Sequence, residues 1–595
     1  MAYDAAARRL RAPGAAATNS PDPTATPVVP SAEASGSSGT PMLSDGSSSS
    51  SDWHSLEVTV AVVAAAHPSL DLSLGRPTMV ASGQWPRIHT CFWTRQRHHR
   101  RGGKNSHCRF PPSPRGLPLV GNLHQLIGSK LHHHTLGALA AVHGPVMLLR
   151  LGRLPVIVVS SADAAQEVLQ AQDHVFAGRP TLSVPRMLLY GCTDIAFAPY
   201  GPYWRGVRKM SVQHLLGPAR VRATRAVREQ EAEALVRRVA GHADAGGVLR
   251  LSEVLVDYAK DVMGRIVLGT RAAGDDGWRA KLDVLMDDSI ELLGAFHVGD
   301  CLPWLSWVAD VDGTNAKTRR AFLNIDRILD EIVDGAEREM NHNDGALHNN
   351  EAEEEAFVHV LLSLHKEPDG TEWRLNRDNV KALLEDLFGA GMEAAIIVLE
   401  WAMAELLRHK GAMKKLQHEI RQQQANGGLM VREQDLQGTE YLRCVVKETL
   451  RLHSPAPLLL PHVATQATRI INQRYEYDVP SNAMVIVNGW AIGRNPATWE
   501  SPEEFRPERF IGSEVDFRGQ HFQFIPFGSG RRMCPALNLT VAMVEIALAN
   551  LVGRFDWALP EEDKELDMEE SPGLAVRKKV PLRAIAIVPS RSSGH

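Results

Sequence analysis

The feature that most restricts how this chain can fold is a glycine-rich loop at 527–536 that carries one cysteine and runs into an apolar segment. The loop reads FGSGRRMCPA, with the cysteine at position 534. Its two glycines permit a tight turn, and a proline suits the first turn of a helix because its missing amide hydrogen costs nothing there. We therefore expect Cys534 at a helix N-terminus, where the helix dipole and free amides favour the thiolate, the form that binds metals.

The alternative for Cys534 is an inert buried cysteine, the usual state of an isolated cysteine. The chain has six cysteines and no CxxC pair, which excludes a disulfide scaffold and disfavours a zinc knuckle. Against the inert reading, chance would produce the four positions Phe527, Gly530, Arg532 and Cys534 in a chain this long only on the order of a few times in a thousand.

At these residues the sequence resembles the cytochrome P-450 family, whose haem loop has the pattern F-x-x-G-x-R-x-C. The resemblance covers about residue 106 to the C-terminus. It implies that the Cys534 thiolate is the axial ligand of the iron of haem b (iron protoporphyrin IX), where it favours cleavage of the O–O bond. It also implies that Arg532 binds a haem propionate. Ala536 replaces the family's usual glycine, and we expect its methyl group to crowd the turn without removing a ligand.

Two further motifs follow the family's order along the chain. Glu448 and Arg451 lie one helical turn apart and can pair, although a Glu-x-x-Arg quartet alone is expected by chance about once in such a chain. The string FRPERF follows about sixty residues later and contains Arg509. By resemblance, Glu448, Arg451 and Arg509 form a buried ion-pair network with a structural role.

Upstream, Trp204 and Arg208 are four residues apart and therefore share a helical face. By resemblance they bind a haem propionate, and His462 serves the same propionates. The alternatives are an amphipathic surface helix and an ordinary half-buried histidine. The strings PPSPRGLPLVGNLHQL, FAGRP and WAIGR are similar to those of plant A-type members of the family.

The stretch Asn376–His409 is predicted as a long apolar helix that Gly389-Ala390-Gly391 loosens locally, leaving room for a ligand. The alternative is close helix packing on small residues. In the family this helix crosses the distal face of the haem with the pattern A-G-x-D/E-T-T/S. This chain has AGMEAA, so the catalytic positions keep the acid as Glu393 and replace the alcohol by Ala394.

The missing hydroxyl bears on the reaction because an alcohol beside an acid orders the water that delivers protons to reduced dioxygen. Three hypotheses remain open. The chain is a monooxygenase whose substrate supplies the hydroxyl, an isomerase or dehydratase of the same fold that needs no dioxygen activation, or a weakly active haem-binding pseudoenzyme. The intact cysteine loop and its companion motifs favour the first.

The expected fold is mainly α with small β-sheets (α+β), which by resemblance is the cytochrome P-450 fold with haem between the distal helix and the helix after Cys534. Pro145–Ser161 predicts a hairpin around Gly152-Arg153, and Met484–Asn488 predicts another strand. Besides Asn376–His409, apolar periodicity predicts the following helices: Ala162–Gln172, Pro218–Val239, Leu251–Leu268, Glu440–His453 and Pro535–Gly553.

The first 105 residues separate into segments by composition. Residues 1–55 are rich in Ala, Ser and Pro and are expected to be disordered, while 56–105 hold a degenerate anchor region and a basic linker. No apolar run reaches the roughly 20 residues that a membrane-spanning helix needs. By resemblance the haem domain, 106–595, lies on the cytosolic face of the endoplasmic reticulum membrane. A plastid location and an incorrectly joined first exon are the alternatives.

Charge and family together define the expected partners. With 65 Lys plus Arg against 69 Asp plus Glu, the chain has no excess of positive charge for nucleic acid. The leading hypothesis is a haem-thiolate monooxygenase that oxidises an apolar small molecule with electrons from NADPH, delivered by NADPH-cytochrome P-450 reductase. Arg205, Lys209 and Arg531 form a basic surface for that reductase, or are simply solvated. A two-domain binding protein would require the whole cysteine loop to be coincidence.

The same resemblance locates the substrate pocket, although it does not name the substrate. Ser183–Phe197, Phe388–Glu393, Ala456–Leu460 and the turn near Leu574 are expected to line it, and they are mostly apolar. Plant members of this type oxidise specialised metabolites such as terpenoids, phenolics and indoles.

Overall fold

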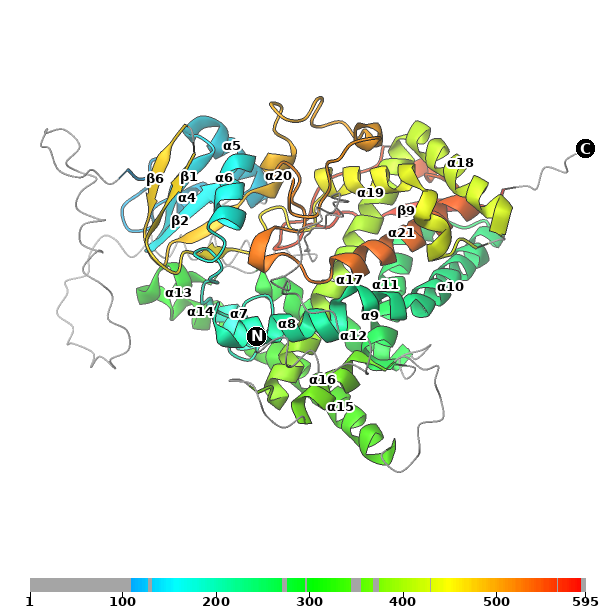
Figure 1. Cartoon of the computed structure of the whole chain (residues 1–595), viewed down its shortest axis with the longest axis horizontal. Helices are drawn as coiled ribbons and strands as arrows, with labels where there is room; N and C mark the ends of the chain where they lie inside the picture. The colour runs from blue at the N-terminus through cyan, green and yellow to red at the C-terminus, as the bar shows by residue number, and fades with distance from the viewer. Residues whose placement is uncertain are drawn as a thin grey trace, which may run out of the picture. The chain divides into compact units, whose positions relative to one another are not determined.

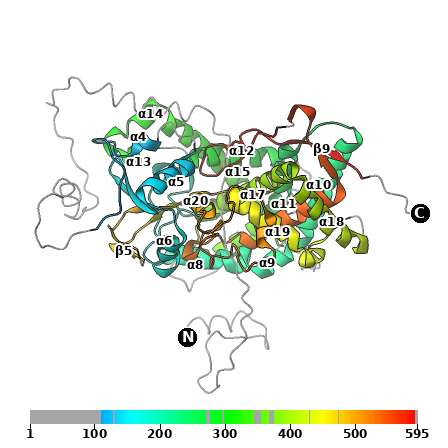
Figure 2. The same ribbon diagram turned by 90° about the horizontal axis from the view of Figure 1, so that it is seen from above.

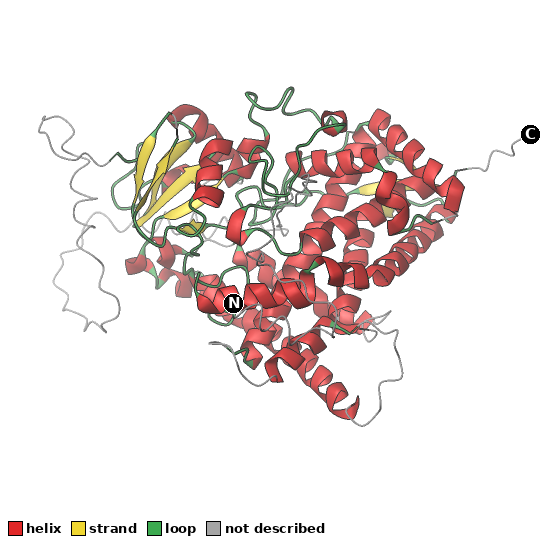
Figure 3. Ribbon diagram, in the orientation of Figure 1, coloured by secondary structure: helices red, strands yellow, loops and turns green. Residues whose placement is uncertain are grey.

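The computed structural model describes residues 109–126, 131–269, 276–294, 297–343, 355–366, 374–427, 430–472, 474–563 and 565–589. The described part is mainly helical with small sheets, as predicted (Figure 3). The segments predicted as disordered (1–55) and as anchor and linker (56–105) lie outside the described residues, so their predictions stay predictions.

The largest sheet of the described residues has four strands in the order β1-β2-β7-β4 (Figure 1). The predicted hairpin is confirmed as β1 (Val146–Leu151) and β2 (Leu154–Val159), which pair antiparallel. The strand β7 (Met484–Val487), also predicted, runs parallel to β2, and β4 (His462–Val463) pairs antiparallel with β7. The sheet therefore places His462 at its edge strand.

Two smaller sheets complete the β-structure of the described chain. The strands β5 (Thr468–Ile471) and β6 (Glu476–Val479) form a hairpin. The strand β9 (Arg583–Ile587) pairs antiparallel with both β3 (Leu249–Arg250) and β8 (Asp556–Ala558).

The helices account for most of the described chain and surround the cysteine loop. The α-helices before residue 370 are α4 (Leu123–Leu126), α5 (His132–His143), α6 (Ala162–Gln166), α7 (Ser183–Leu188), α8 (Pro202–Ser211), α9 (Pro218–Ala223), α10 (Arg225–Asp244), α11 (Leu251–Leu268), α12 (Asp276–Leu293), α13 (Val298–Cys301), α14 (Val308–Val311), α15 (Thr314–Asn343) and α16 (Phe357–Lys366). From there on the helices are α17 (Arg377–Arg408), α18 (Lys410–Gly427), α19 (Glu440–Leu452), α20 (Gly489–Gly493) and α21 (Leu537–Arg554).

The predicted helices are present, with differences at their ends. α11 matches its prediction residue for residue. The stretch predicted as one helix from Pro218 is two, α9 and α10, because the Thr224 hydroxyl donates to the Val221 carbonyl oxygen at 3.2 Å and interrupts the helix. α21 begins at Leu537, so Pro535 precedes the helix instead of opening it.

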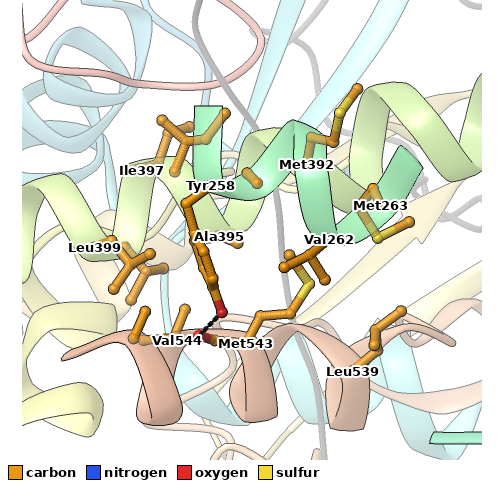
Figure 4. Close-up of a cluster of buried hydrophobic side chains, with 14 of the residues drawn as sticks. Tyr258, Val262, Met263, Met392, Ala395, Ile397, Leu399, Leu539, Met543 and Val544 are labelled. Carbon is orange, nitrogen blue, oxygen red and sulfur yellow. Dashed lines mark hydrogen bonds between the residues drawn. The ribbon is translucent and has the colours of Figure 1, made fainter. Parts of the chain in front are cut away.

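Helices α11, α17 and α21 form a buried contact that fixes the distal helix relative to the helix after the cysteine loop (Figure 4). The Tyr258 hydroxyl of α11 donates to the Met543 carbonyl oxygen of α21 at 2.9 Å, and all three helices contribute apolar side chains to the cluster drawn in the figure. Among the described residues, α21 is the one helix long and apolar enough to cross a membrane, and most of it is buried inside the protein.

The small residues of α17 serve close packing, because the helix runs unbroken from Arg377 to Arg408. A Cβ added at Gly391 would lie 2.8 Å from the Met263 Cε of α11. The helix is therefore not interrupted at 389–391 and packs closely at Gly391, while nothing lies within 4 Å of a Cβ added at Gly389. Ala390 and Gly391 also line the cavity described below, so the predicted room for a ligand is present beside the close packing. Asn376 caps the helix, since its side chain accepts a hydrogen bond from the Asn379 amide at 2.8 Å.

Candidate active site

One cavity brings the predicted cofactor-binding residues together. It lies between α17 on one side and the cysteine loop with the start of α21 on the other. All five residues predicted to hold the cofactor line this cavity: Trp204, Arg208, His462, Arg532 and Cys534. They come from α8, β4 and the cysteine loop, which are far apart in the sequence.

The cysteine loop is held in shape by backbone conformations that require glycine. Gly528 and Gly530 have φ of 69° and 67°, the left-handed region that side chains disfavour. A Cβ at Gly530 would also collide with the Leu169 carbonyl oxygen. The Cys534 amide donates to the Phe527 carbonyl oxygen at 3.1 Å, which closes the loop and aims the cysteine at the cavity.

Burial dominates the protonation of the cysteine in the protein alone. It raises the pKa of the Cys534 thiol to about 11, although the amides of Ala536 and Leu537 and the Arg208 guanidinium act in the opposite direction. The amides at the start of the helix therefore lower the pKa of the thiol, as predicted, but their effect is smaller than that of burial. A bound metal ion would supply the missing stabilisation, since coordination deprotonates a thiol outright.

Ala536 fits the turn without strain. It is the N-cap of α21 with φ of −89° and ψ of 5°, which any residue can adopt. The methyl group of Ala536 therefore causes no strain in the backbone of the turn.

Three buried guanidinium groups form one wall of the cavity, from Arg179, Arg208 and Arg532. Burial lowers the pKa of Arg179 and Arg208 to about 10 each, and burial together with Arg179 lowers that of Arg532 to about 8. They donate to backbone carbonyls such as those of Ala177 and Leu460, and none forms an ion pair with a carboxylate in the described part of the chain. Such desolvated cations need an anion nearby.

Trp204 lines the cavity and contacts two of its neighbours. Its indole N–H, the only donor on the ring, donates to the Ile195 carbonyl oxygen at 2.9 Å. The Arg532 guanidinium lies over the ring, 4.1 Å from its centroid. The prediction that Trp204 binds a propionate stays a prediction, and in this structure its ring also positions Arg532 by a cation–π contact.

His462 is buried on the same wall. Its Nδ1 donates to the Phe176 carbonyl oxygen at 2.8 Å, because a carbonyl can only accept. Burial, helped by Arg179, holds the pKa of His462 well below its usual range, so Nε2 carries no proton. Binding a carboxylate through Nε2 would require a proton there, which an anion at this position would favour.

The cavity and its donors fit haem b. A single thiol faces the cavity from the loop, and the buried guanidinium wall supplies the positive charge that two propionate carboxylates need. Arg208 also donates to the Met533 carbonyl oxygen next to the cysteine, so one side chain ties the cationic wall to the ligand loop. The buried carboxylate of Asp194 acts on Arg179 and Arg532 without forming an ion pair with either. The excess of three guanidinium groups over this one carboxylate is the observation that favours a dianionic cofactor.

On the distal side, the two predicted catalytic positions do not line the cavity. The carboxylate of Glu393 is buried and accepts two hydrogen bonds from the Arg577 guanidinium, in the segment before β9. Ala394 is buried against Ala456. The residues of α17 that do line the cavity next to them are Ala390 and Gly391. Glu393 is therefore committed to an ion pair in this conformation.

The acidic residue that α17 presents to the cavity is Asp386, which sequence reasoning missed. Its Oδ2 accepts a hydrogen bond from the Ile195 amide at 2.6 Å. Burial raises the pKa of Asp386 well above its usual range, and the neighbouring Asp194 adds to this effect. Burial raises the pKa of Asp194 to about 6. The only signal in the sequence is the acidic pair Glu385-Asp386 between apolar residues, one helical turn before Ala390.

Arg179 was also missed as a site residue, although its string FAGRP was noted. Its guanidinium donates to the Ala196, Leu460 and Pro461 carbonyl oxygens at 2.8 to 2.9 Å. A basic residue between apolar neighbours and a proline was the available signal. It ties the loop before α8 to the turn before β4.

The predicted ion-pair network is present behind the cysteine loop. Arg451 donates to both carboxylate oxygens of Glu448 at 2.8 Å, and Arg509 donates to one of them at 2.9 Å. The side chains of Glu448 and Arg451 are fully buried. Both guanidinium groups also pack over the ring of Trp499. Every charge of the network thus has a partner, as a buried carboxylate requires.

The predicted pocket segments contribute unevenly to the cavity. Ile195, Ala196, Ala456, Leu459 and Leu460 line it as expected, whereas Leu574 is not among the lining residues.

Comparison with known proteins gives a family match over most of the chain. The model of the family described as Cytochrome P450 matches residues 111–584. The chain is 42% identical over 480 residues to "Cytochrome P450 736A117" of Prunus mume, covering 80% of this chain and 90% of that protein. It is 41% identical over 502 residues to "Cytochrome P450 71A4" of Solanum melongena, covering 84% and 95%.

A relative named for its activity and a solved structure give the same picture. The chain is 41% identical over 493 residues to "Norfluorocurarine oxidase" of Strychnos sp, covering 81% of this chain and 93% of that protein. Among solved structures, a zebra fish cytochrome P450 with abiraterone matches with a TM-score of 0.64 at 23% identity, covering 78% of this chain and all of that one. The structural likeness concerns the fold alone.

Proposed function

The chain belongs to the cytochrome P450 family and is a haem-dependent monooxygenase, and we propose that it inserts one oxygen atom from dioxygen into an apolar plant specialised metabolite. The observation that carries this proposal is the single cavity in which Cys534 faces the distal helix α17 beside a wall of buried guanidinium groups. The proposed electron source is NADPH, through NADPH-cytochrome P-450 reductase.

The lining of the cavity supports an apolar substrate. Side chains such as Leu216, Met263, Leu387 and Leu459 dominate the wall around α17, where Asp386 is the one acidic group among the described lining residues. Apolar walls with few polar groups bind ligands by burial and orient them by those groups. We infer a hydrocarbon-like skeleton with one hydroxyl or carbonyl group that hydrogen-bonds to Asp386.

The chain's own residues would hold the reactants as follows. Bound haem supplies the iron at which dioxygen is reduced. Cys534 would ligate that iron, and Arg179 and Arg532 would bind the two propionates, which relieves the desolvation of both guanidinium groups. Ala390 and Gly391 leave space on the distal side because neither carries a bulky side chain.

Proton delivery is the step for which this chain lacks the usual groups. Ala394 has no hydroxyl, and Arg577 holds the carboxylate of Glu393. The hydroxyl-bearing residues that line the described cavity are Ser529 and Thr540, both on the cysteine side. We therefore propose that a hydroxyl of the substrate orders the water that carries protons into the site.

The surface outside the cysteine loop supports docking of an acidic reductase. Arg205 and Lys209 are exposed on α8, next to Arg208 of the cavity wall. Arg531 is half-exposed and pairs with Asp173 at 3.0 Å, so its charge is partly offset. Complementary charge raises association rates more than affinity. Reversing the charge of Arg205 and Lys209 should slow reduction by the reductase and leave the haem spectrum unchanged.

An apolar face supports attachment to a membrane surface. Trp304, Trp307 and Val311 are 47%, 52% and 75% exposed, and the nearby Leu117 and Leu119 are 50% and 63% exposed. Helices α13 and α14 share a small core with the segment around Leu123, and Figure 2 shows α4 beside them. Exposed tryptophans favour the membrane–water interface. We propose that this face rests on the endoplasmic reticulum membrane.

The decisive experiment is spectroscopic and then kinetic. The purified protein should show a Soret band and the carbon monoxide difference spectrum of a haem thiolate after reduction. Turnover of an apolar substrate should then depend on both NADPH and the reductase. A protein without haem-thiolate absorbance would contradict the proposal.

A second candidate is an isomerase or dehydratase that needs no dioxygen activation. The pairing of Glu393 with Arg577 and the alanine at 394 favour it, since neither usual proton-delivery group reaches the cavity. Product formation without NADPH and reductase would identify this reaction. Haem-thiolate absorbance with no turnover of either kind would identify a pseudoenzyme.

A further inference from the structure

A second cluster of metal-binding side chains lies at the start of α5, outside the haem cavity. His133 Nε2 is 2.8 Å from Glu570 Oε2, and His134 Nε2 is 3.2 Å from the same oxygen. These three atoms all lie within 4.8 Å of one another. We propose that His133, His134 and Glu570 form a binding site for a divalent transition-metal ion, with zinc as the best fit.

The ligand set selects the class of metal. Two imidazole nitrogens and one carboxylate oxygen match the preferences of zinc, copper and nickel, whereas magnesium and calcium prefer sets made only of oxygen. Tetrahedral zinc with such ligands places their donor atoms about 3.3 Å apart. The two nitrogen–oxygen separations, 2.8 and 3.2 Å, are about 0.5 and 0.1 Å shorter than this value, so an outward shift of the side chains would admit the ion.

The cluster is built from rigid, distant parts of the chain. His133 and Glu570 are 437 positions apart in sequence, and their side chains are 4% and 10% exposed. Asn488 donates to the His133 carbonyl oxygen at 2.9 Å, and the ring of Trp490 stacks on that of His134 with 4.2 Å between centroids. Two ligands are therefore held in place before any ion binds, which reduces the ordering cost.

Access and charge decide whether an ion can enter. The His134 side chain is 45% exposed, so the site opens to solvent on that side. The Glu570 carboxylate supplies a negative charge, and the Arg494 guanidinium opposes a cation from the far side of Trp490. Arg494 is itself paired with Glu503 at 3.0 Å, which reduces this repulsion. The remaining coordination positions would be filled by water.

A bound ion would link α5 to the segment around Glu570, which otherwise contact each other here through the hydrogen bonds of this cluster. α5 covers the four-stranded sheet, and Glu570 lies in the segment that continues to Arg577, the partner of Glu393. The site is independent of the proposed reaction, because none of its three ligands lines the haem cavity. The alternative is a plain hydrogen-bonded cluster in which protonated histidines pair with the carboxylate.

The test compares zinc binding to the full-length holoprotein and to two variants of α5. After chelation and dialysis, calorimetric titration with zinc chloride is carried out on the wild type, His134→Arg and His143→Ala. His134→Arg removes a ligand and keeps a cation for Glu570, while His143→Ala removes a histidine at the other end of the same helix. A difference measurement is needed because the chain has 25 histidines.

We expect the wild type and His143→Ala to bind one more zinc ion per chain than His134→Arg, or to bind that ion at least tenfold more tightly. Glu570→Gln should behave like His134→Arg, and magnesium should bind none of the variants at this site. The Soret band checks that each variant remains folded, and His134→Gln replaces His134→Arg if the latter loses it. Equal zinc stoichiometry and affinity in all variants overturns the proposal.

Discussion

The cysteine side and the distal side of the cavity differ in how completely their residues are committed to one arrangement. On the cysteine side, the loop glycines, Arg532 and the network around Glu448 all occupy positions that suit a bound haem. On the distal side, Glu393 is turned into an ion pair with Arg577, and Asp386 lines the cavity instead. The comparison indicates that the residues that hold the cofactor are already in position, whereas the reaction on the distal side depends on the substrate that binds there.

The largest expected effect tests the cysteine side. Replacing Cys534 by alanine removes the only thiol that lines the cavity, since the other described cysteines lie elsewhere. We expect complete loss of the haem-thiolate spectrum, measured as the reduced carbon monoxide difference spectrum. As a control, Cys301→Ala should keep it. A variant at 534 with an unchanged Soret band would remove the basis of the assignment.

The next effect concerns the network behind the loop. Replacing Glu448 by glutamine leaves the buried guanidinium groups of Arg451 and Arg509 without their carboxylate. We expect a loss of about 3 to 5 kcal/mol in the free energy of unfolding, with loss of haem, because unpaired buried charges are costly.

The matched control for this variant is Glu500→Gln, which also breaks an ion pair but at the surface, since the Glu500 side chain is 77% exposed. We expect it to leave the free energy of unfolding nearly unchanged, because exposed ion pairs contribute little. Denaturant titration followed by the Soret band measures both variants. Equal losses would mean that burial of the network adds nothing.

A smaller effect tests the distal side. Replacing Ala394 by threonine restores the hydroxyl next to Glu393, and we expect the ratio of product formed to NADPH consumed to rise severalfold. The contact of Ala394 with Ala456 leaves little space, so Ala394→Ser is the conservative partner variant. If neither variant improves the ratio, proton supply through position 394 does not limit the reaction.

The smallest expected effect is a change of folding stability with pH that comes from the buried carboxyl groups of Asp194 and Asp386. Burial holds the pKa of Asp194 and Asp386 above 3.8 in the folded chain, whereas the unfolded chain releases these protons near that value. The folded state therefore binds more protons, and stability falls as the pH rises from about 4 through the folded pKa, about 6 for Asp194.

Asp386→Asn removes one of these titrations and keeps an oxygen that can accept from the Ile195 amide. Its free energy of unfolding relative to wild type should increase as the pH rises from about 5 to about 8, because only the wild type releases the Asp386 proton in the folded state over this range. Glu503→Gln, at an exposed side chain, should show no such trend. A constant difference across this range would mean that Asp386 is already ionised.

The sequence predicted the fold and the cysteine side well because these depend on local patterns. The turn around Gly528 and Gly530 and the pairing of Glu448 with Arg451 are fixed by residues close in sequence. The role of Trp204 and the absence of Glu393 from the cavity depend on Ile195 and Arg577, which lie in other parts of the chain. No pattern within α17 could reveal that its acid has a partner 184 positions away.

The contact of α11, α17 and α21 has a consequence for engineering this protein. Tyr258 and Met543 join α11 and α21, which together with α17 contribute helical residues to the cavity lining, whereas Ile195, Ala456 and Leu460 line it from loops. Libraries that randomise these loop positions can change which compound is accepted without altering the scaffold that holds the iron. Closely related sequences can thus diverge in selectivity while retaining the same redox centre.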